Sequence, residues 1–347
     1  MKEAFELCRQ NRITITGVCS DNAANIKCAL TKDHPLCLRG LIGDAVFWLS
    51  CSAHTSQLAL DDFLTKNPQL SSAVRDMVSM VSWIGERDDT FKNYVPCKLP
   101  KYCCTRWNTL CDTLEAILQS AEEINRFLVE QSELEKAHYY KKIQRAHKPG
   151  KVIAPTPPPL DHVPEWWTEL LDAVRVIKIF TANVEGDLMF QQDLYMAYRK
   201  AIDAFEALEE NQFARALESY FIQRFVDTCN IEFAHLAYVF TAEGLSDFRE
   251  RHPNFEDEQC LVEIGSLKAC FRSLATNYYS NEEYNQLFLP GLFDLYLQEA
   301  DFGTGENLYC WWKQRFVDKI SSPGINHGRP VSLNPLAEIA LIVVTMP

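Results

Sequence analysis

Apolar residues recur at intervals of three and four along most of this chain, and this period restricts much of it to packed amphipathic helices. The pattern is evident in several stretches after residue 65. They are SSAVRDMVSMVSWI from residue 71, NTLCDTLEAILQSAEEINRFLVEQ from 108, LYMAYRKAIDAFEALEE from 194, SLKACFRSLATNYY from 266 and YNQLFLPGLFDLYLQEA from 284. We therefore expect helices over nearly all of the chain beyond residue 52.

The first part of the chain has a different pattern, in which short β-branched and aromatic runs precede helical ones. RITITGV at 12–18 alternates polar and apolar residues, which is typical of a strand buried on one face, and a glycine with a short polar turn ends it. NAANIKCAL at 22–30 predicts a helix, AVFWLSC at 45–51 a second strand, and AHTSQLALDDFL at 53–64 a further helix. The sequence thus predicts a mixed α/β fold that is mostly α.

The composition restricts the partners of the chain. There are 34 lysine and arginine residues against 47 aspartate and glutamate residues, so the formal net charge is −13 and any nucleic-acid contact must be local or made by another chain. The 13 cysteines, with no signal-peptide pattern, indicate reduced thiols in a cytosolic or nuclear protein. The longest apolar run, IALIVVTM at 339–346, is much shorter than the roughly 20 residues of a membrane span, so we expect no membrane partner.

A proline-rich segment interrupts the helical part of the chain. AHKPGKVIAPTPPPLDHVP at 146–164 predicts an extended or mobile linker. A basic cluster at 136–151 precedes and overlaps it. A solvated helix face is the favoured interpretation of this cluster, and contact with phosphate is the alternative. Two tryptophan pairs, at 166–167 and 311–312, are expected in the core, with contact to a partner as the alternative.

Asp21 lies where the first strand gives way to a helix, in GVCSDNAANIKCAL at 17–30. An aspartate at this point is the expected N-cap, whose carboxylate accepts backbone N–H groups. It could instead bind a metal, but a phosphoryl-transfer site needs several carboxylates to hold two Mg²⁺ ions about 4 Å apart. Taken alone, Asp21 favours the cap.

Cys51 and His54 follow the second strand at a spacing of three, which would place both side chains on one face of a helical turn. A structural zinc site needs two more ligands. Cys103 and Cys104 are the candidates, but adjacent cysteines point in different directions, and the chain has no C-x-x-C or H-x₃-H pair. A nucleophilic cysteine would need a third, orienting group. The residues by themselves favour a buried thiol and a hydrogen-bonded histidine.

Arg106 and Trp107 lie in CCTRWNTL at 103–110, where Thr105 or Asn108 could cap the helix that follows. The guanidinium could stack on the indole as a packing pair. Equally, an arginine with an aromatic residue at a helix start can hold a phosphate and stack an unpaired base. Without further context the packing pair is favoured.

Taken together and in this order, these stretches resemble the hAT superfamily of DNA transposases and the domesticated proteins derived from it. Each stretch is unspecific alone, and jointly they extend over residues 12–347. The resemblance is carried by SDNAANIKCAL at 20–30, WLSCSAHTSQLALDD at 48–62, TRWNTL at 105–110, LYCWWKQRF at 308–316 and NPLAEIALIVVTMP at 334–347.

The resemblance implies an RNase H-like α/β core that is interrupted, after its fifth strand, by a large all-helical insertion domain. Residues 1–65 would be a partial RNase H-like core with the fourth and fifth strands. Residues 66–305 would be the helical insertion, with the proline-rich linker at 146–164. Residues 306–347 would begin the C-terminal dimerisation and core-return region.

The resemblance also implies roles for the candidate residues. Asp21 matches the second of three acids that bind Mg²⁺ or Mn²⁺ in the family. Cys51 and His54 match the C-x-x-H motif beside the fifth strand. Arg106 and Trp107 match the R-W motif, whose tryptophan is associated with stabilising a flipped base during hairpin formation.

The other two acids of the family are expected to be missing. The first lies on a strand well upstream of the second, and the third follows the segment that ends at Pro347. Glu338 falls in the preceding apolar helix and is not assigned. The first three core strands and an N-terminal zinc finger are expected to be absent as well. Because one carboxylate cannot fix two Mg²⁺ ions, we expect this chain to bind no metal and to leave Asp21 as a cap.

The predicted function is that of a hAT-transposase-like fragment, truncated at both ends, whose ancestral role is metal-dependent DNA strand cleavage and transfer. We expect no catalytic activity from this chain alone. The alternative is a domesticated helical protein-interaction module in the nucleus, which the acidic balance favours. The expected partners are transposon-end DNA in an intact protein, and a homodimer or protein partner through residues 306–347.

Overall fold

The computed structural model describes residues 3, 6–7, 10–11, 17–20, 47–96, 98–103, 108–145, 153–185, 190–229, 231–276, 280, 282, 292–300, 312, 322–323, 330–331, 336–337, 339–340 and 343. The strands are β1 (Gly17–Ser20), β2 (Phe47–Ser50), β3 (Ser322–Pro323) and β4 (Pro330–Val331), and the π-helix is η2 (Phe225–Cys229). The helices are α4 (Ser52–Lys66), α5 (Pro68–Gly85), α6 (Asp88–Phe91), α7 (Asn108–Gln119), α8 (Ala121–Arg145), α9 (Trp167–Val184), α10 (Gln191–Glu206), α11 (Gln212–Arg224), α12 (Ile231–Val239), α13 (Ala242–Arg251), α14 (Glu258–Ala275) and α16 (Leu292–Glu299). The prediction of a mixed but mostly helical chain is confirmed for these residues.

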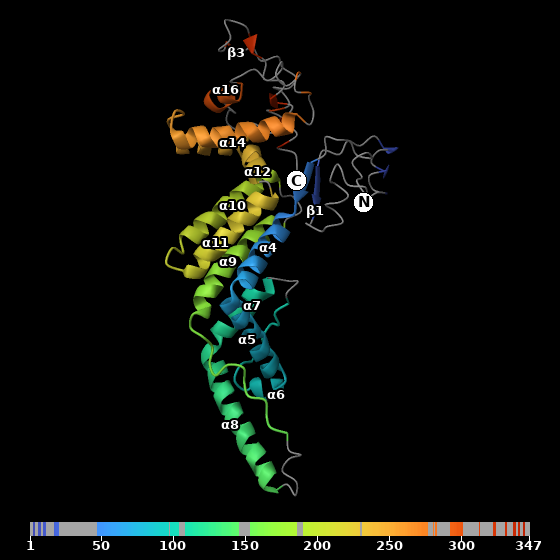
Figure 1. Cartoon of the computed structure of the whole chain (residues 1–347), viewed down its shortest axis with the longest axis vertical. Coiled ribbons are helices and arrows are strands. Elements are labelled where there is room, and N and C mark those ends of the chain that lie inside the picture. Colours follow the sequence, from blue (N-terminus) through green and yellow to red (C-terminus); the bar gives the residue numbers. More distant parts are fainter. Residues whose placement is uncertain are drawn as a thin grey trace. The chain divides into compact units, whose positions relative to one another are not determined.

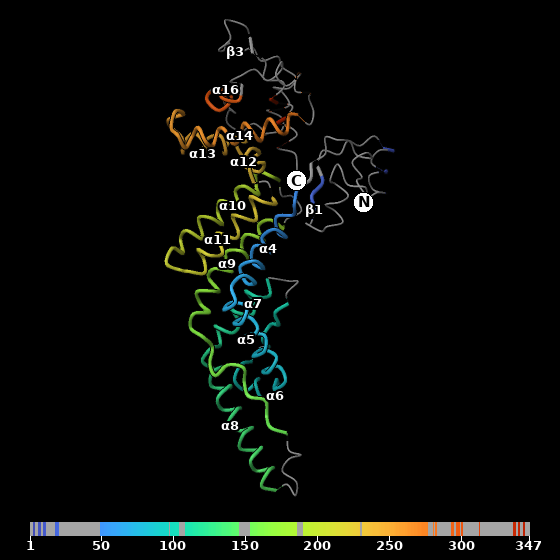
Figure 2. Tube along the Cα trace, viewed as in Figure 1, coloured from blue at the N-terminus to red at the C-terminus, as the bar shows by residue number. Residues whose placement is uncertain are grey.

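Two compact units make up the chain, and their elements can be followed by colour in Figure 1 and Figure 2. Unit 1 contains Met1–Ser56, Phe180–Lys200 and Ile222–Pro347, and unit 2 contains Gln57–Ile179 and Ala201–Phe221. Unit 1 therefore combines the strands with helices from the second half of the chain. The RNase H-like core and the division at residues 65 and 305 stay predictions.

β1 and β2 form a parallel pair in unit 1. Gly17 pairs with Phe47, and Ser20 pairs with Ser50. The sequence placed the end of the first strand at residue 18, but the ladder continues to Ser20, because pairing with β2 satisfies backbone groups that a turn would have left free. The predicted residues 12–16 and the predicted helix at 22–30 lie outside the described residues.

The core of unit 1 is built around Phe240, in the turn between α12 and α13. Its buried ring packs on Phe271 of α14 at a centroid distance of 6.2 Å, on Tyr296 of α16 at 5.4 Å, and on Trp312 at 5.4 Å. Edge and tilted contacts of this kind add roughly 0.5–1.5 kcal/mol each to the free energy of burial. One side chain thus joins three segments that are far apart in the sequence.

Polar groups of the same aromatic residues close the end of α12. The Tyr296 hydroxyl donates to the Val239 carbonyl at 2.8 Å, and Trp312 Nε1 donates to the Phe240 carbonyl at 2.9 Å. The last carbonyls of a helix have no partner within it, and leaving one buried and unpaired costs about 1–3 kcal/mol. Burial raises the pKa of Tyr296 well above its ordinary value, and the positive charge of Arg249 offsets only part of this rise. The hydroxyl therefore stays protonated and remains a donor.

The described residues near the C-terminus belong to this core as well. They share one hydrophobic cluster with Leu49 of β2 and with the aromatic rings around Phe240. The buried side chains of this terminal segment are Leu336, Ala337, Ile339, Ala340 and Val343. The core interpretation of Trp312 is confirmed, and a homodimer through residues 306–347 stays a prediction.

Side-chain caps begin α5, α13 and α14. Asn67 Oδ1 accepts from two backbone N–H groups of α5, Thr241 Oγ1 accepts from Gly244 N–H at 2.9 Å, and Asp257 caps α14. A Cβ atom at residue 244 would overlap the carbonyl oxygen of Tyr238. Glycine at this position therefore allows the start of α13 to approach the end of α12 closely.

A partly buried carboxylate joins α12, α13 and α14 in unit 1. Glu263 accepts from His252 Nε2 at 2.6 Å and from Arg251 Nη1 and Nη2 at 3.1 Å. His235 Nε2 lies 3.1 Å from the same carboxylate, at ion-pair distance but without hydrogen-bond geometry, and stacks on Tyr195 at 4.3 Å. Burial alone would raise the pKa of Glu263, but the two histidines and the arginine outweigh burial and lower that pKa to about 2.

We predict that Glu263→Gln lowers the free energy of unfolding at pH 7 by about 2 kcal/mol, because the amide leaves the partly buried Arg251 guanidinium without its counter-charge. The pKa is lowered on folding from an ordinary value of 4.5, so this stability is complete above pH 4.5 and is lost as the pH falls toward 2. Urea unfolding between pH 7 and pH 3 measures both effects. The exposed Glu256→Gln is the matched control, and equal stability of the two variants would contradict the prediction.

Unit 2 has an aromatic core around Phe127 of α8. The Phe127 ring lies 5.9 Å from Trp83 of α5, 5.1 Å from Phe91 of α6 and 5.2 Å from Tyr94, in edge-on arrangements. Trp83 in turn carries the Arg87 guanidinium 3.8 Å above its ring. The apolar faces of these helices therefore pack together in one aromatic cluster.

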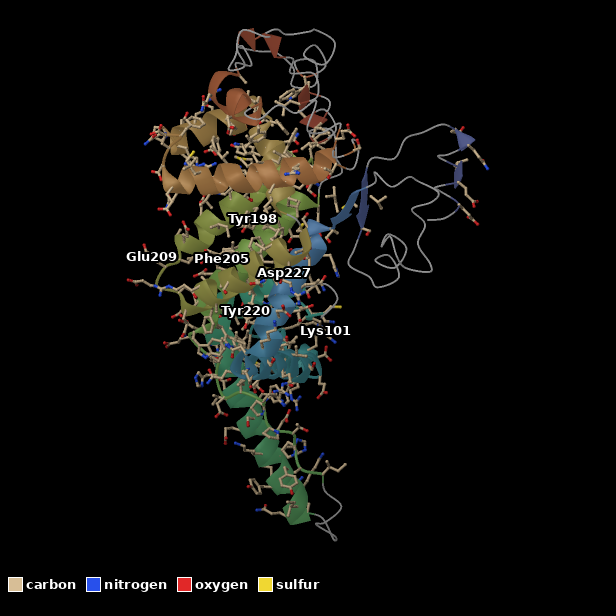
Figure 3. All side chains as sticks on the ribbon, turned by 45° about the horizontal axis from the view of Figure 1, so that its top comes forward. Lys101, Tyr198, Phe205, Glu209, Tyr220 and Asp227 are labelled. Carbon is tan, nitrogen blue, oxygen red and sulfur yellow. The ribbon has the colours of Figure 1, made fainter. Side chains whose placement is uncertain are left out.

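Aromatic contacts also join the remaining helices of unit 2. Phe205 of α10 packs on Phe221 of α11 at 5.8 Å, and Phe63 of α4 packs on Tyr220 at 6.3 Å. Phe205 and Tyr220 are labelled in Figure 3. These pairs place apolar side chains from three separate helices against one another, as the three-and-four period predicts.

The stretch from residue 108 to 131, which the apolar period joined into one helix, forms two. α7 ends at Gln119 and α8 begins at Ala121. Ser120 N–H donates to the Ile117 carbonyl three residues back at 3.2 Å, which is the spacing of a 3₁₀ turn. The period does not reveal this break, because Ile117 and Ile124 are buried on either side of it.

The described part of the basic cluster at 136–151 is the C-terminal end of α8. The buried side chains of α8 all lie in its first half, at Ile124, Phe127 and Leu128. Lys141, Lys142 and every other basic residue of this end are exposed. The solvated helix face is therefore confirmed for residues 136–145, and contact with phosphate stays a prediction.

The described part of the proline-rich segment, residues 153–164, contains no helix or strand but is bound to unit 2 at two points. Trp83 Nε1 donates to the Thr156 carbonyl at 2.9 Å, and Val163 N–H donates to Asn125 Oδ1 at 2.7 Å. This part of the predicted linker is therefore attached to its own unit by two hydrogen bonds.

We predict that Trp83→Phe releases this segment, because phenylalanine keeps the packing on Phe127 but removes the indole N–H that binds Thr156. Losing one hydrogen bond of about 1 kcal/mol should raise the population of the open segment roughly fivefold. Timed thermolysin digestion with mass spectrometry should show faster cleavage within 153–162. Tyr140→Phe, on the exposed end of α8, is the control, and unchanged cleavage in Trp83→Phe would contradict the prediction.

Candidate functional site

The carboxyl ends of β1 and β2 meet at one edge of the parallel pair. Cys51 N–H donates to the Ser20 carbonyl at 2.7 Å, which continues the ladder one residue beyond the end of β2. Ligands of parallel sheets bind at the carboxyl ends of the strands. Asp21 is the next residue after Ser20 in the chain, but it lies outside the described residues.

The first turn of α4 is fixed by buried hydroxyl groups. Thr55 N–H and Thr55 Oγ1 both donate to the Cys51 carbonyl, at 2.9 Å and 3.0 Å, so Cys51 is the residue from which the helix starts. Ser56 Oγ donates to the Ala53 carbonyl at 2.8 Å and lies 2.9 Å from Thr181 Oγ1 near the end of α9. Thr55 and Ser56 are both fully buried, so these bonds hold the turn in one orientation.

Cys51 and His54 come from this fixed turn. Cys51 precedes α4 and His54 is its third residue, as their spacing predicted. Both are partly buried, and Cys51 is a free thiol. The structure therefore confirms that the two residues lie on one helical turn directly after a strand, whereas their catalytic role stays a prediction.

Two further thiols lie near Cys51. Cys229 of η2 donates from Sγ to the Ser50 carbonyl at 3.6 Å. The pKa of Cys229 is raised to about 12, mainly by burial. The hydrogen bond with Thr55 lowers this pKa, whereas the thiols of Cys19 and Cys51 raise it. The surface area of Cys19 classes it as exposed. Desolvation by the surrounding protein atoms nevertheless raises the pKa of its thiol, and the Cys51 thiol raises that pKa further. A thiol with a raised pKa is a poor nucleophile, so Cys19 and Cys229 do not form a nucleophilic site.

Sequence reasoning did not find Cys229 or Thr181. Each lies more than a hundred residues along the chain from its partner at the strand edge, and no motif links them. Only the packing of η2 and α9 brings them together. Within the described ranges, no group of three histidine, cysteine, aspartate or glutamate residues could hold a metal ion.

Arg106 and Trp107 lie outside the described residues, but residues 98–103 before them and 108–119 after them are described. Thr109 Oγ1 accepts from Cys103 N–H at 2.8 Å and donates to the Cys103 carbonyl at 3.3 Å. α7 begins at Asn108, whose buried Oδ1 atom has no hydrogen-bond partner among the described residues, so Asn108 is the first helical residue and not the predicted cap.

No protein-family model and no curated protein matches this chain. In the part of the chain that the structure describes, no helix is both long enough and apolar enough to cross a membrane. The function must therefore be inferred from the residues and their geometry.

We predict that Cys229 resists alkylation in the folded protein, because its side chain is only 2% exposed and its pKa is about 12. At pH 8 roughly one molecule in 10⁴ would carry the thiolate, and reactivity should rise as the pH approaches 12. Iodoacetamide labelling with peptide mapping measures this, and labelling in urea gives the fully reactive reference. Modification of Cys229 at pH 8 as fast as that of exposed Cys19 would contradict the prediction.

Proposed function

We propose that this chain is part of a hAT-type DNA transposase, in which Asp21 is one of the carboxylates that hold divalent metals for strand cleavage and transfer. The observation that supports the proposal is the parallel β1–β2 pair, whose carboxyl ends are joined by the hydrogen bond from Cys51 to Ser20. Asp21 follows Ser20 directly, so its backbone starts from the edge where parallel sheets bind ligands. An RNase H-like core and a nuclear location belong to the same proposal.

The residues of the site have distinct tasks in this proposal. Asp21 binds metal, and the Mg²⁺ or Mn²⁺ ions would supply an activated water and neutralise charge at the phosphate. Cys51 holds the strand edge through its N–H group, and His54 belongs to the turn that Ser56 and Thr181 fix. Because one carboxylate cannot hold two ions, Asp21 would need further carboxylates beside it to form a catalytic metal site.

The R-W pair supplies the DNA contact in this proposal. The Arg106 guanidinium would bind a backbone phosphate, and the Trp107 indole would stack on an unpaired or flipped base. The support is local, because Thr109 ties the residues before and after the pair together. The net charge of −13 makes a localised contact of this kind necessary.

We infer a helical protein-interaction module in the nucleus as the second candidate. The acidic balance favours it, because a surface of net charge −13 repels DNA and attracts basic proteins. Most of the described chain is packed helix, which can present a rigid surface to a partner.

We predict that this chain alone, incubated with Mg²⁺ or Mn²⁺, neither cleaves duplex DNA nor forms hairpins. When the reading frame is extended to include an upstream aspartate strand and a downstream E-R-x-F-S-like helix, we expect cleavage that Asp21→Asn reduces by at least about 100-fold. Gel assays on end-labelled duplexes measure both outcomes.

Asp89→Asn, at a fully exposed aspartate of α6, is the matched control and should leave cleavage unchanged. Cleavage by the extended protein that survives Asp21→Asn would refute the assignment of Asp21. Cleavage by this chain alone that Asp21→Ala abolishes would refute the requirement for two further acids. Absence of such flanking sequences from the gene would favour the interaction module.

A further inference from the structure

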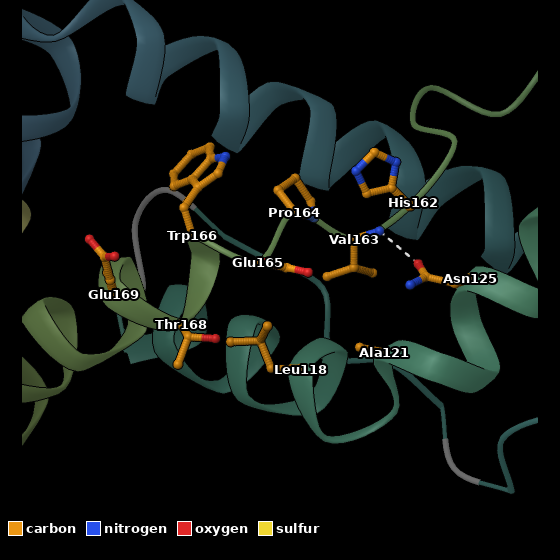
Figure 4. Close-up of a pocket in the computed structure, with 10 residues that line it drawn as sticks. All are labelled: Leu118, Ala121, Asn125, His162, Val163, Pro164, Glu165, Trp166, Thr168 and Glu169. Carbon is orange, nitrogen blue, oxygen red and sulfur yellow. Dashed lines mark hydrogen bonds between the residues drawn. The ribbon is translucent and has the colours of Figure 1, made fainter.

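A groove lies in unit 2 where α7 meets α8 and where the chain enters α9, as Figure 4 shows. Its volume is about 950 Å³. The apolar part of its lining consists of Leu118, Ala121, Val163 and Pro164. The hydrogen bond from Val163 N–H to Asn125 Oδ1, drawn in Figure 4, fixes the position of one side relative to the other.

The turn that leads into α9 carries the polar part of the lining. Thr168 N–H donates to the Glu165 carbonyl at 3.1 Å, which starts the helical turn before α9 itself begins. Glu165 and Glu169 both line the groove, one on each side of Trp166 in Figure 4. Asn211 Nδ2 donates to the Glu169 carbonyl at 2.7 Å and holds the turn in place.

Trp166 lies between these two glutamates in the sequence and is a large aromatic side chain that remains partly open, with 37% of its surface exposed. One part of its indole packs on Phe213 at 5.6 Å and another on Trp167 at 6.3 Å. These contacts fix the ring while leaving its outer surface at the groove. The core interpretation of this tryptophan pair is thus confirmed for buried Trp167 and is wrong for Trp166.

The two carboxylates at the groove lack cationic partners. Acidic residues of the neighbouring α7 are paired, since Glu115 binds Arg175 at 2.9 Å and Asp112 binds Lys178 at 2.7 Å. By contrast, Glu165 and Glu169 have no ion-pair or hydrogen-bond partner for their carboxylates among the described residues. The dipole of α9 stabilises an acid in its first turn, but it does not account for a second acid, an exposed indole and a groove at the same place.

We propose that this groove binds an arginine side chain of a basic polypeptide segment. A guanidinium group can donate to two carboxylates and stack its flat face on the Trp166 indole, and its aliphatic stem can cover Leu118 and Val163. The net charge of −13 attracts a basic segment and opposes the approach of a second copy of this chain. This binding site depends on the groove alone and not on the transposase proposal. For the interaction module, it identifies the partner as a basic, arginine-containing segment.

Fluorescence anisotropy of a labelled tetra-arginine peptide with the full chain tests the proposal. We expect binding that weakens about tenfold in the double variant Glu165→Gln, Glu169→Gln, because two charge-assisted contacts are lost. The double variant Glu209→Gln, Glu210→Gln is the matched control. It removes the same charge from the exposed turn between α10 and α11, where Figure 3 labels Glu209, and should bind as the wild type does.

The variant Trp166→Leu tests the contribution of the indole separately from that of the two carboxylates, because leucine keeps apolar contact with Phe213 but has no aromatic face. It should weaken tetra-arginine binding about threefold and tetra-lysine binding less, because the planar guanidinium stacks better than an ammonium group. Circular dichroism confirms that each variant is folded.

Equal weakening in both glutamine double variants would show attraction by bulk charge only and would overturn the proposal. Binding unaffected by Glu165→Gln, Glu169→Gln would overturn it as well. Self-association that these two substitutions abolish, measured by sedimentation without peptide, would assign the groove to a second copy instead. None of these results alters the strand-cleavage test, so the two proposals fail separately.

Discussion

The end of α12 is the point on which the architecture of unit 1 depends. The carbonyls of its last residue, Val239, and of the next residue, Phe240, are buried and would each cost about 1–3 kcal/mol without a donor. The donors are the Tyr296 hydroxyl and the Trp312 indole, which come from segments more than fifty residues further along the chain. Because the same two rings also pack on Phe240, hydrogen bonding and apolar burial select one position for α16 and for Trp312. The late segments are therefore part of the core that contains Leu49 of β2.

The strand edge uses the same combination of paired polar groups and burial. Its backbone is closed by the bond from Cys51 to Ser20, and its first helical turn is held by the buried hydroxyls of Ser56 and Thr181. A rigid edge of this kind suits a site whose carboxylates must hold metal ions at a fixed separation. The groove in unit 2 differs, because its aromatic ring is fixed while its carboxylates are unpaired. The transposase proposal thus rests on polar groups that are hydrogen-bonded within the protein. The arginine-binding proposal rests on carboxylates that have no partner among the described residues.

Local patterns predicted the elements better than their ends or their contacts. The short run of β-branched and aromatic residues predicted β2, and the period of three and four predicted α4, α5, α10 and α14. The break at Ser120 was missed because both adjoining helices bury apolar residues, and the end of β1 was placed too early because its last residues depend on pairing with β2. The proline-rich composition correctly predicted a segment without helix or strand, but composition contains no signal for the hydrogen bond that Trp83 gives to Thr156.

The sequence by itself determined the helical character of this chain, its acidity, the strand-to-helix step at Cys51 and the resemblance on which the transposase proposal rests. These properties follow from residue type and spacing within a few turns of the chain. Only the tertiary structure decided that Cys229 and Thr181 support the strand edge, that the terminal apolar residues are core, and that Trp166 stays open beside two unpaired glutamates. The physical reason is that burial and charge pairing depend on neighbours brought together by packing, sometimes from more than a hundred residues away, and no local pattern specifies those neighbours.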